Sequence, residues 1–209
     1  MQRIVLMQQS LLNEDSLLRA VASAASRMNT EIAGLFIEDI DLLNLAGMPF
    51  ASEVCFPSAT RREMDVAYLE KLLRRLAGEA RRALESVARN TELRVSFRVA
   101  RGSIFSELVA AASDTDVVIT GSLTRARSKP SLTLICGAGI APQTIADLLR
   151  DLAPRISGEI TIVLIGRSSL DCKRWEQELR GAIKPDWNPR RMRVVCPKDE
   201  QDLERMLRA

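Results

Sequence analysis

A stretch of about 30 residues, from Leu93 to Ser122, constrains the fold more than any other part of this chain. It opens with Leu93–Val99, where apolar and polar residues alternate as they do in a strand. Ser103 can then cap a helix with one apolar face, and the β-branched run Asp116–Thr120 follows that helix. Strand, helix and strand within this length predict a βαβ unit, and the wholly apolar second strand predicts a parallel sheet covered on both faces.

The two predicted strands of this unit end in residues that can approach a ligand. Arg101 and Gly102 follow the first strand, and Gly121 and Ser122 follow the second. Ligands bind beyond the carboxyl ends of the strands in open parallel sheets. We therefore expect these four residues at the ligand-facing edge of the sheet.

The residues before this unit predict two further strands and two helices. Arg3–Met7 and Glu31–Ile37 read as strands, and Asn13 can cap a helix between them. A long amphipathic helix is predicted from Thr60 to Asn90. Residues 40–59 are apolar, are interrupted by prolines and do not fit a short loop. We consider two interpretations for them, a lid over the protein's own core or a surface for a dimer partner or a ligand.

A partial internal repeat relates the second half of the chain to the first. Strands are predicted to begin at residues 131 and 159, as they do at residues 3 and 31, which is an offset of 28 residues in both halves. A helix at 170–182, a strand at 191–196 and a terminal helix that Asp199 can cap complete the second half. We infer two related α/β lobes, residues 1–125 and residues 126–209, the second reduced. One continuous sheet is the competing architecture.

Part of this pattern resembles a known family. Gly102, Leu108 and Asp116–Gly121 look like the last βαβ unit of the universal stress protein family, and residues 1–122 follow that family's element order. The resemblance implies a Rossmann-like or flavodoxin-like α/β sandwich on a parallel sheet, and tandem pairs of such domains occur in the family. It also implies a cytoplasmic stress-response or regulatory protein that forms a homodimer and, in the nucleotide-binding members, binds ATP or AMP.

The sequence departs from the family's nucleotide site in two places. Nucleotide-binding members carry an acidic residue just after the first strand, where this chain has Gln8, Gln9 and Ser10. Their glycine-rich loop has the form G-x2-G-x9-G-[ST]; Gly121 matches its first glycine, but Thr124 replaces the second and the Gly-Ser pair is missing. The resemblance therefore implies a phosphate loop that is mostly lost.

A polar group at this edge remains the candidate site for a small anion or an adenine nucleotide, because arginine binds phosphate and carboxylate bidentately. Its members are Gln8, Ser10, Arg101, Gly102, Gly121, Ser122, Thr124, Arg125 and Arg127. In the alternative interpretation, residues 123–130 are a solvated basic linker that only connects the two lobes.

The second lobe offers a rival site. Gly137 and Gly139 follow a predicted strand and open a helix, as in a dinucleotide-binding turn, but Pro142 replaces the third glycine. Arg167 and Ser168, which follow the next strand, suit the 2′-phosphate of NADP. The alternative interpretation is a tight strand-to-helix turn without a ligand.

The residue content excludes several classes of site and partner. The chain has no histidine, which removes histidine metal ligands and histidine bases. The four cysteines, Cys55, Cys136, Cys172 and Cys196, lack metal-ligand and redox spacing, so we expect small buried apolar side chains and no metal. The net charge of +3 does not indicate specific nucleic-acid binding. No apolar run could cross a membrane, and the N-terminus lacks a signal-peptide layout, which favours the cytoplasm.

These observations favour a non-catalytic stress-response or regulatory protein that acts through a small ligand or through contacts with proteins. The alternative is a nucleotide-dependent enzyme, a weak ATPase or an NADP-linked reductase, that uses the carboxyl ends of the strands. A third hypothesis is a structural homodimer in which residues 40–59 form the contact.

Overall fold

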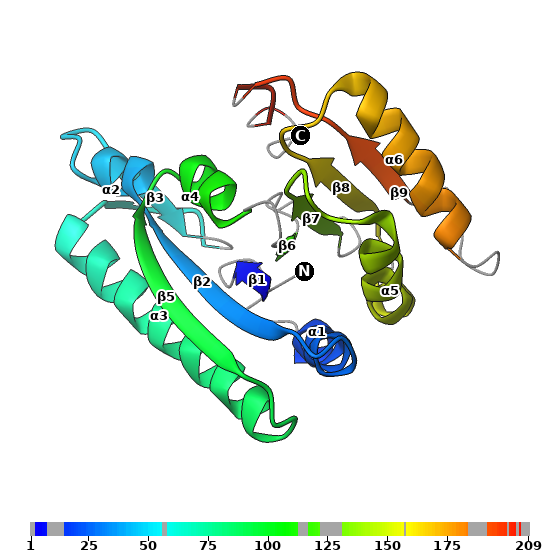
Figure 1. Cartoon of the computed structure of the whole chain (residues 1–209). Helices are drawn as coiled ribbons and strands as arrows, with labels where there is room; N and C mark the ends of the chain where they lie inside the picture. Colours follow the sequence, from blue (N-terminus) through cyan, green and yellow to red (C-terminus); the bar gives the residue numbers. More distant parts are fainter. Residues whose placement is uncertain are drawn as a thin grey trace.

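The computed structural model of this chain describes residues 3–7, 15–55, 58–112, 117–121, 131–156, 158–183, 192–199, 201–203 and 205. Its elements follow the predicted alternation of strands and helices (Figure 1). The strands are β1 (Arg3–Met7), β2 (Glu31–Asp39), β3 (Ser52–Cys55), β4 (Thr60–Glu63), β5 (Val95–Gly102), β6 (Val117–Gly121), β7 (Leu132–Cys136), β8 (Ile160–Leu164) and β9 (Met192–Val195). The helices are α1 (Asp15–Arg27), α2 (Ile40–Ala46), α3 (Val66–Arg89), α4 (Ile104–Ala111), α5 (Pro142–Leu152) and α6 (Ser169–Ala182), with a 3₁₀ turn at Ala153–Arg155.

The strands of both predicted lobes lie in one seven-stranded sheet of order β5-β2-β1-β6-β7-β8-β9. Every neighbouring pair is parallel except β6 and β7, which are antiparallel. Arg3 pairs with Glu31 and Leu132 pairs with Ile160, so the predicted offset of 28 residues recurs in the register of both halves. The predicted α/β class with a mostly parallel sheet is confirmed, whereas the division into domains at residues 125 and 126 stays a prediction.

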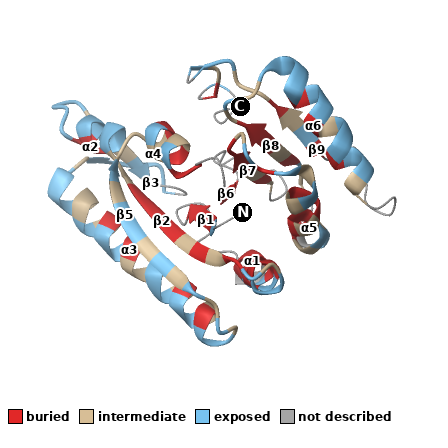
Figure 2. Cartoon of the chain, viewed as in Figure 1, coloured by how far each residue is buried: buried red, intermediate tan, exposed pale blue. Residues whose placement is uncertain are grey.

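The helices are distributed unequally over the two faces of the sheet. The inward sides of α1, α5 and α6 share one apolar cluster with alternate residues of the strands, and the later part of α3 joins it through Leu84. The first part of α3 and α2 pack on the same face over Phe36 of β2. On the other face lie α4 and the helical residues 201–203, which pack through Phe105, Leu108 and Leu203. Figure 2 shows the buried residues concentrated in the central strands and on the inner sides of α1 and α5.

The segment between β2 and α3 differs in part from the prediction. The helix predicted from Thr60 begins only at Val66, because Asp65 caps it by accepting a hydrogen bond from the backbone N–H of Ala67 at 2.9 Å. The residues Thr60–Glu63 instead form β4, which pairs with β3 in a two-stranded antiparallel sheet of its own. The long apolar connection is therefore a short helix followed by a hairpin.

The prediction that all four cysteines are small buried apolar side chains was wrong for one pair, which forms a disulfide. Cys172 in the first turn of α6 and Cys196 directly after β9 form a disulfide, with Cα atoms 6.3 Å apart. A sequence separation of 24 residues hides this proximity, which exists because the chain returns from α6 to a strand beside it. Cys136 is buried and free, as predicted, and burial raises the pKa of its thiol. The side chain of Cys55 lies outside the described residues.

Candidate functional site

The first predicted ligand residue, Arg101, is engaged within the protein. It lies at the end of β5, where its Nε donates to Glu38 Oε2 and a terminal nitrogen donates to Glu70 Oε1, both at 3.0 Å. Hydrogen bonding to Glu38, and then to Glu70, raises the pKa of the Arg101 guanidinium. Two carboxylates already neutralise this charge, so Arg101 is a poor anchor for an anion.

The two described glycines of the predicted site lie at the same edge of the sheet but not side by side. Gly102 ends β5 and is in register with Asp39 of β2, whereas Gly121 is buried at the end of β6. The strands β2 and β1 lie between β5 and β6. The other predicted members of this site are outside the described residues: Gln8, Ser10, Ser122, Thr124, Arg125 and Arg127.

The rival site of the second lobe lies at the opposite edge of the sheet. Because β7 runs antiparallel to β6, the carboxyl ends of β7 and β8 point away from those of β1 and β6. The two predicted sites therefore do not combine into one.

The residues of this rival site form hydrogen bonds that stabilise the turn between β7 and α5. The Arg167 guanidinium donates to the carbonyl oxygens of Ala138 and Ile140, the second at 3.3 Å, and these residues flank Gly139 in the turn that begins at Gly137. Trp175 of α6 donates to the same Ile140 oxygen at 2.9 Å. Ser168 caps α6 by accepting from the Asp171 backbone N–H at 3.2 Å. These contacts match the interpretation as a tight strand-to-helix turn.

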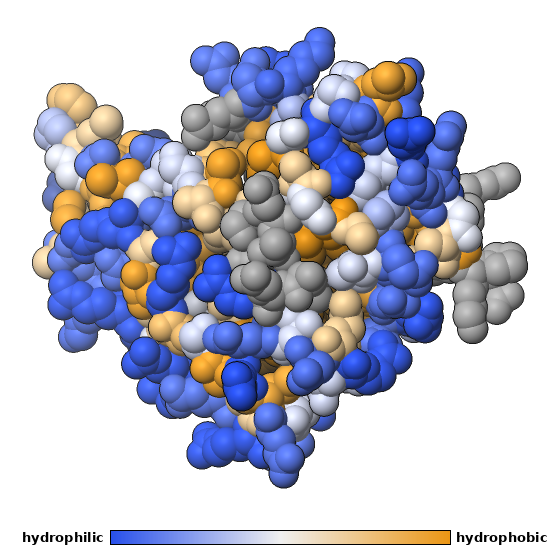
Figure 3. All heavy atoms as spheres, in the orientation of Figure 1, coloured by the Kyte–Doolittle hydropathy of each residue, from blue (hydrophilic) through white to orange (hydrophobic). Residues whose placement is uncertain are grey.

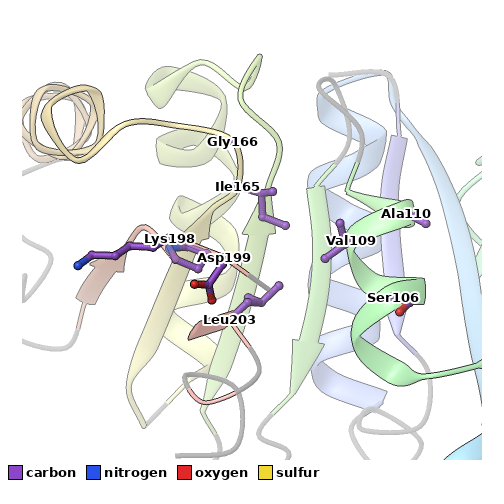
Figure 4. Close-up of a pocket in the computed structure, with 9 residues that line it drawn as sticks. Ser106, Val109, Ala110, Ile165, Gly166, Lys198, Asp199 and Leu203 are labelled. Atoms are coloured by element: carbon purple, nitrogen blue, oxygen red, sulfur yellow. The ribbon is translucent and has the colours of Figure 1, made fainter. Parts of the chain in front are cut away.

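A pocket of about 460 Å³ opens between α4 and the segment after β9, on the sparsely covered face of the sheet. Figure 4 shows Ile165 and Leu203 on one wall, Val109 and Ala110 of α4 on the other, and Lys198 extending away from α4. None of the residues predicted to bind a ligand lines this pocket. Its signal was the composition of α4, IFSELVAA, which is apolar on more than the face that packs against the sheet.

The pocket has few polar groups that could fix a ligand. The Asp199 carboxylate accepts a hydrogen bond from the backbone N–H of Asp202 at 2.8 Å and thereby caps the helical residues 201–203, as predicted for the terminal helix. Specific small-molecule sites combine apolar walls with several convergent polar groups. In the part of the chain that the structure describes, no group of three or more acidic or cysteine side chains could hold a metal ion, and no helix is long and apolar enough to span a membrane.

A second feature is an exposed apolar surface formed by α2, the β3–β4 hairpin and the first turn of α3, which we call the α2–hairpin surface. Leu43 and Ala46 anchor α2 by packing inward. Phe50, between α2 and β3, is 95% exposed. The large exposed side chains of this surface are Ile40, Leu42, Leu45, Met48, Phe50, Val54, Val66 and Tyr68.

The exposure of these side chains decides between the two interpretations of residues 40–59 for most of the segment. A lid would bury its apolar side chains against the sheet, but only Leu43 and Ala46 of α2 are buried. The two-stranded hairpin stands apart from the main sheet. The other large apolar side chains that the structure describes in this segment are exposed and available to a partner: Ile40, Leu42, Leu45, Met48, Phe50 and Val54.

The comparisons with known proteins find solved structures that resemble this chain, all with low sequence identity and low TM-scores. No family model matches the chain, and no curated protein matches its sequence. A solved structure of the hypothetical protein MJ0577 is 12% identical, has a TM-score of 0.31, and is covered over 97% of its length by 95% of this chain. A universal stress protein from Archaeoglobus fulgidus is 10% identical with a TM-score of 0.32, over 93% of this chain and 76% of that one.

A third solved structure is a glucose-6-phosphate 1-dehydrogenase from Mycobacterium avium, which is 12% identical with a TM-score of 0.25. The match covers 93% of this chain but 35% of the dehydrogenase. The structural neighbours thus include a universal stress protein. At these TM-scores the comparisons assign neither a family nor a function.

Proposed function

We propose that this chain is a non-catalytic regulatory protein of the stress-response type, and that it acts by contacting another protein through the α2–hairpin surface. One observation carries the proposal. Eight of the ten large apolar side chains that are exposed among the described residues lie between Ile40 and Tyr68. Apolar side chains that gather in this way, rather than being scattered singly, mark interaction sites.

The candidate ligand residues support a role without catalysis. Arg101 is held by two carboxylates, so its charge is not free to bind a phosphate, and one terminal nitrogen of Arg167 donates to two backbone carbonyls. The chain has no histidine to act as a base. The assignment to stress response rests on the sequence resemblance of residues 1–122 to the universal stress protein family.

Complementation of a host strain that lacks the gene tests this proposal. The double variant Leu45→Ser with Phe50→Ser removes two exposed side chains of the surface, and Leu170→Ser removes an apolar side chain that is 78% exposed on α6. We expect the wild type and Leu170→Ser to restore survival after oxidative, heat or starvation stress, and the double variant to fail at an unchanged melting temperature. Full restoration of survival by the folded double variant would reject the proposal.

Adenine-nucleotide binding is the second candidate function. The observation that favours it is the position of β1 beside β6, where the strand order reverses and where open α/β sheets bind ligands. Gly121 ends β6 at this point, and the predicted residues Gln8, Ser122 and Arg125 follow the two strands in sequence.

Native mass spectrometry and thermal shift with ATP, AMP and NADP test this second candidate. Binding at this edge predicts a bound mass or a raised melting temperature that Arg125→Ala with Arg127→Ala removes. Stabilisation accompanied by hydrolysis or hydride transfer would instead favour the nucleotide-dependent enzyme. The mass also reports whether the protein is the homodimer that the family resemblance implies.

A further inference from the structure

We propose that the α2–hairpin surface binds a segment of a partner protein that combines apolar side chains with lysine or arginine. This inference rests on the proposed function and adds the chemistry of the partner. It follows from the apolar and the charged groups that share the surface.

The apolar part of the surface is held in place from below. Leu43 is 9% exposed and Ala46 is 4% exposed, and α2 packs against α3 through this side. In the same short helix Leu42 is 36% exposed and Leu45 is 47% exposed, and Met48 follows with 56% of its surface exposed. Figure 3 shows apolar side chains gathered at the end of the molecule where α2 and β3 lie. The surface therefore presents preformed apolar contacts.

The charge around these apolar side chains is opposite in sign to the charge of the whole chain. Residues 38–65 carry six acidic and two basic side chains, a net charge of −4, although the chain as a whole is +3. The acidic residues are Glu38, Asp39, Asp41, Glu53, Glu63 and Asp65, and the basic residues are Arg61 and Arg62.

Two of the acidic side chains are already paired, Glu38 with Arg101 and Glu53 with Arg62. The other four acidic side chains and Arg61 leave a net charge of −3 in this segment. Glu53 accepts from Arg62 Nε at 2.6 Å, and the Arg62 guanidinium also lies over the Tyr68 ring, 4.7 Å from its centroid. Asp41 and Glu63 have no ion-pair partner among the described residues. A cationic segment would supply one.

The same charges disfavour anionic partners. Anionic membrane surfaces and nucleic acids attract basic patches and would be repelled by an acidic rim. A protein segment with apolar and basic side chains would bury its apolar groups against α2 and the hairpin while its cations face the acidic side chains. This is the partner chemistry that the surface fits.

Fluorescence anisotropy with the full chain and a defined peptide tests the inference. The probe is a labelled peptide of about 18 residues made of leucine and lysine, with leucines at helical spacing. The comparison peptides carry glutamate in place of lysine, or the same leucines and lysines in scrambled order. We expect the leucine–lysine peptide to bind at least about tenfold more tightly than either comparison peptide, and its binding to weaken as salt is raised.

Variants locate the binding on the surface. Asp41→Lys with Glu63→Lys should weaken the binding of the leucine–lysine peptide by at least about tenfold and should strengthen the binding of the leucine–glutamate peptide. Leu45→Ser with Phe50→Ser should weaken the binding of both peptides. Leu170→Ser is the matched control and should change neither, because this exposed side chain lies on α6.

The outcomes separate this inference from the proposed function. Equal or tighter binding of the leucine–glutamate peptide, or a charge reversal that leaves binding unchanged, would reject the proposal that the partner is basic. The proposal that the surface contacts a protein would still hold. Self-association that Phe50→Ser abolishes, measured by light scattering, also overturns the chemistry, because the occupant is then a second copy. Absence of peptide binding together with full complementation by the surface variants overturns both proposals.

Discussion

Several arginine side chains among the described residues are engaged by groups of the protein itself. Arg101 pairs with two carboxylates, Arg62 pairs with Glu53 and stacks on Tyr68, and the Arg167 guanidinium donates to backbone carbonyls. Exposed pairs of this kind contribute little to stability, because water and salt screen their attraction. For Arg101 the consequence is functional, because two carboxylates already neutralise its charge and it is not available to a phosphate.

Gly34 of β2 is a position where a single methyl group should destabilise the fold. A Cβ at this residue would lie 2.6 Å from a ring carbon of Phe97 and 2.8 Å from a methyl carbon of Leu84. Overpacking of this kind costs about 1–3 kcal/mol, so we expect Gly34→Ala to lower the free energy of unfolding by that amount in urea denaturation.

The control for this substitution is Gly78→Ala in α3. Its Cβ would meet its nearest neighbour, Arg82, at 3.7 Å, and alanine favours a helix interior over glycine by about 0.5–1 kcal/mol. Gly78→Ala should therefore raise the free energy of unfolding. Equal changes in the two variants would contradict the packing assigned to Gly34.

We expect the buried thiol of Cys136 to lower the free energy of unfolding as the pH becomes alkaline. Burial raises the pKa of its thiol in the folded state, with the nearby Arg167 charge opposing this in part. The unfolded thiol ionises near pH 8.5, and above that pH the unfolded state binds fewer protons than the folded state, so the free energy of unfolding falls as the pH rises.

The slope assigned to Cys136 can reach about 1.4 kcal/mol per pH unit. We expect Cys136→Ala to be less stable at neutral pH but to lose less stability between about pH 8.5 and 10.5. Urea denaturation across this range measures the slope. Parallel stability curves for the variant and the wild type would show that another group is responsible.

The disulfide acts at the scale of elements, because it joins the first turn of α6 to the end of β9. The segment between Cys172 and Cys196 contains most of α6 and all of β9, which is the edge strand of the sheet. A closed loop with this separation of 24 residues restricts the unfolded chain and stabilises the fold by about 3 kcal/mol.

We expect Cys172→Ala with Cys196→Ala to lose about 3 kcal/mol in urea denaturation. Dithiothreitol should lower the stability of the wild type by a similar amount and leave the double variant unchanged. A wild type that does not respond to the reductant, although its thiols become titratable, would contradict a stabilising role for this bond.

The whole molecule is organised around the antiparallel contact of β6 and β7. This contact joins the β5-β2-β1-β6 strands to the β7-β8-β9 strands in one sheet. Across the same boundary α1 packs against α5, and Arg27 forms an ion pair with Asp151. The largest apolar cluster contains residues of both halves, from Ile4 to Met192.

A shared core predicts that the two halves unfold together. Both tryptophans, Trp175 and Trp187, belong to the second half, so their fluorescence reports on that half, whereas circular dichroism reports on the helices of both. We expect coincident urea transitions by the two methods. Separate midpoints would instead support residues 1–125 and 126–209 as independent domains.

Local sequence patterns predicted most of the helices and strands. The run Arg3–Met7 is β1 with the predicted bounds, and Pro142 begins α5 as a proline in a first turn does. Alternation and helical spacing are properties of neighbouring residues, so a sequence carries them directly. The β3–β4 hairpin was missed because its pairing leaves Thr60–Glu63 exposed and without a core-facing pattern.

The sequence by itself determined the α/β class, the repeat interval of 28 residues and the approximate positions of the seven strands of the main sheet. Only the tertiary structure decided that β7 runs against β6, which places the two predicted sites at opposite edges of the sheet. It also decided the Cys172–Cys196 bond, the partners of Arg101 and the exposure of Phe50. Strand direction, side-chain pairing and exposure depend on which distant segments come together, and this is set by packing of the whole chain rather than by neighbouring residues.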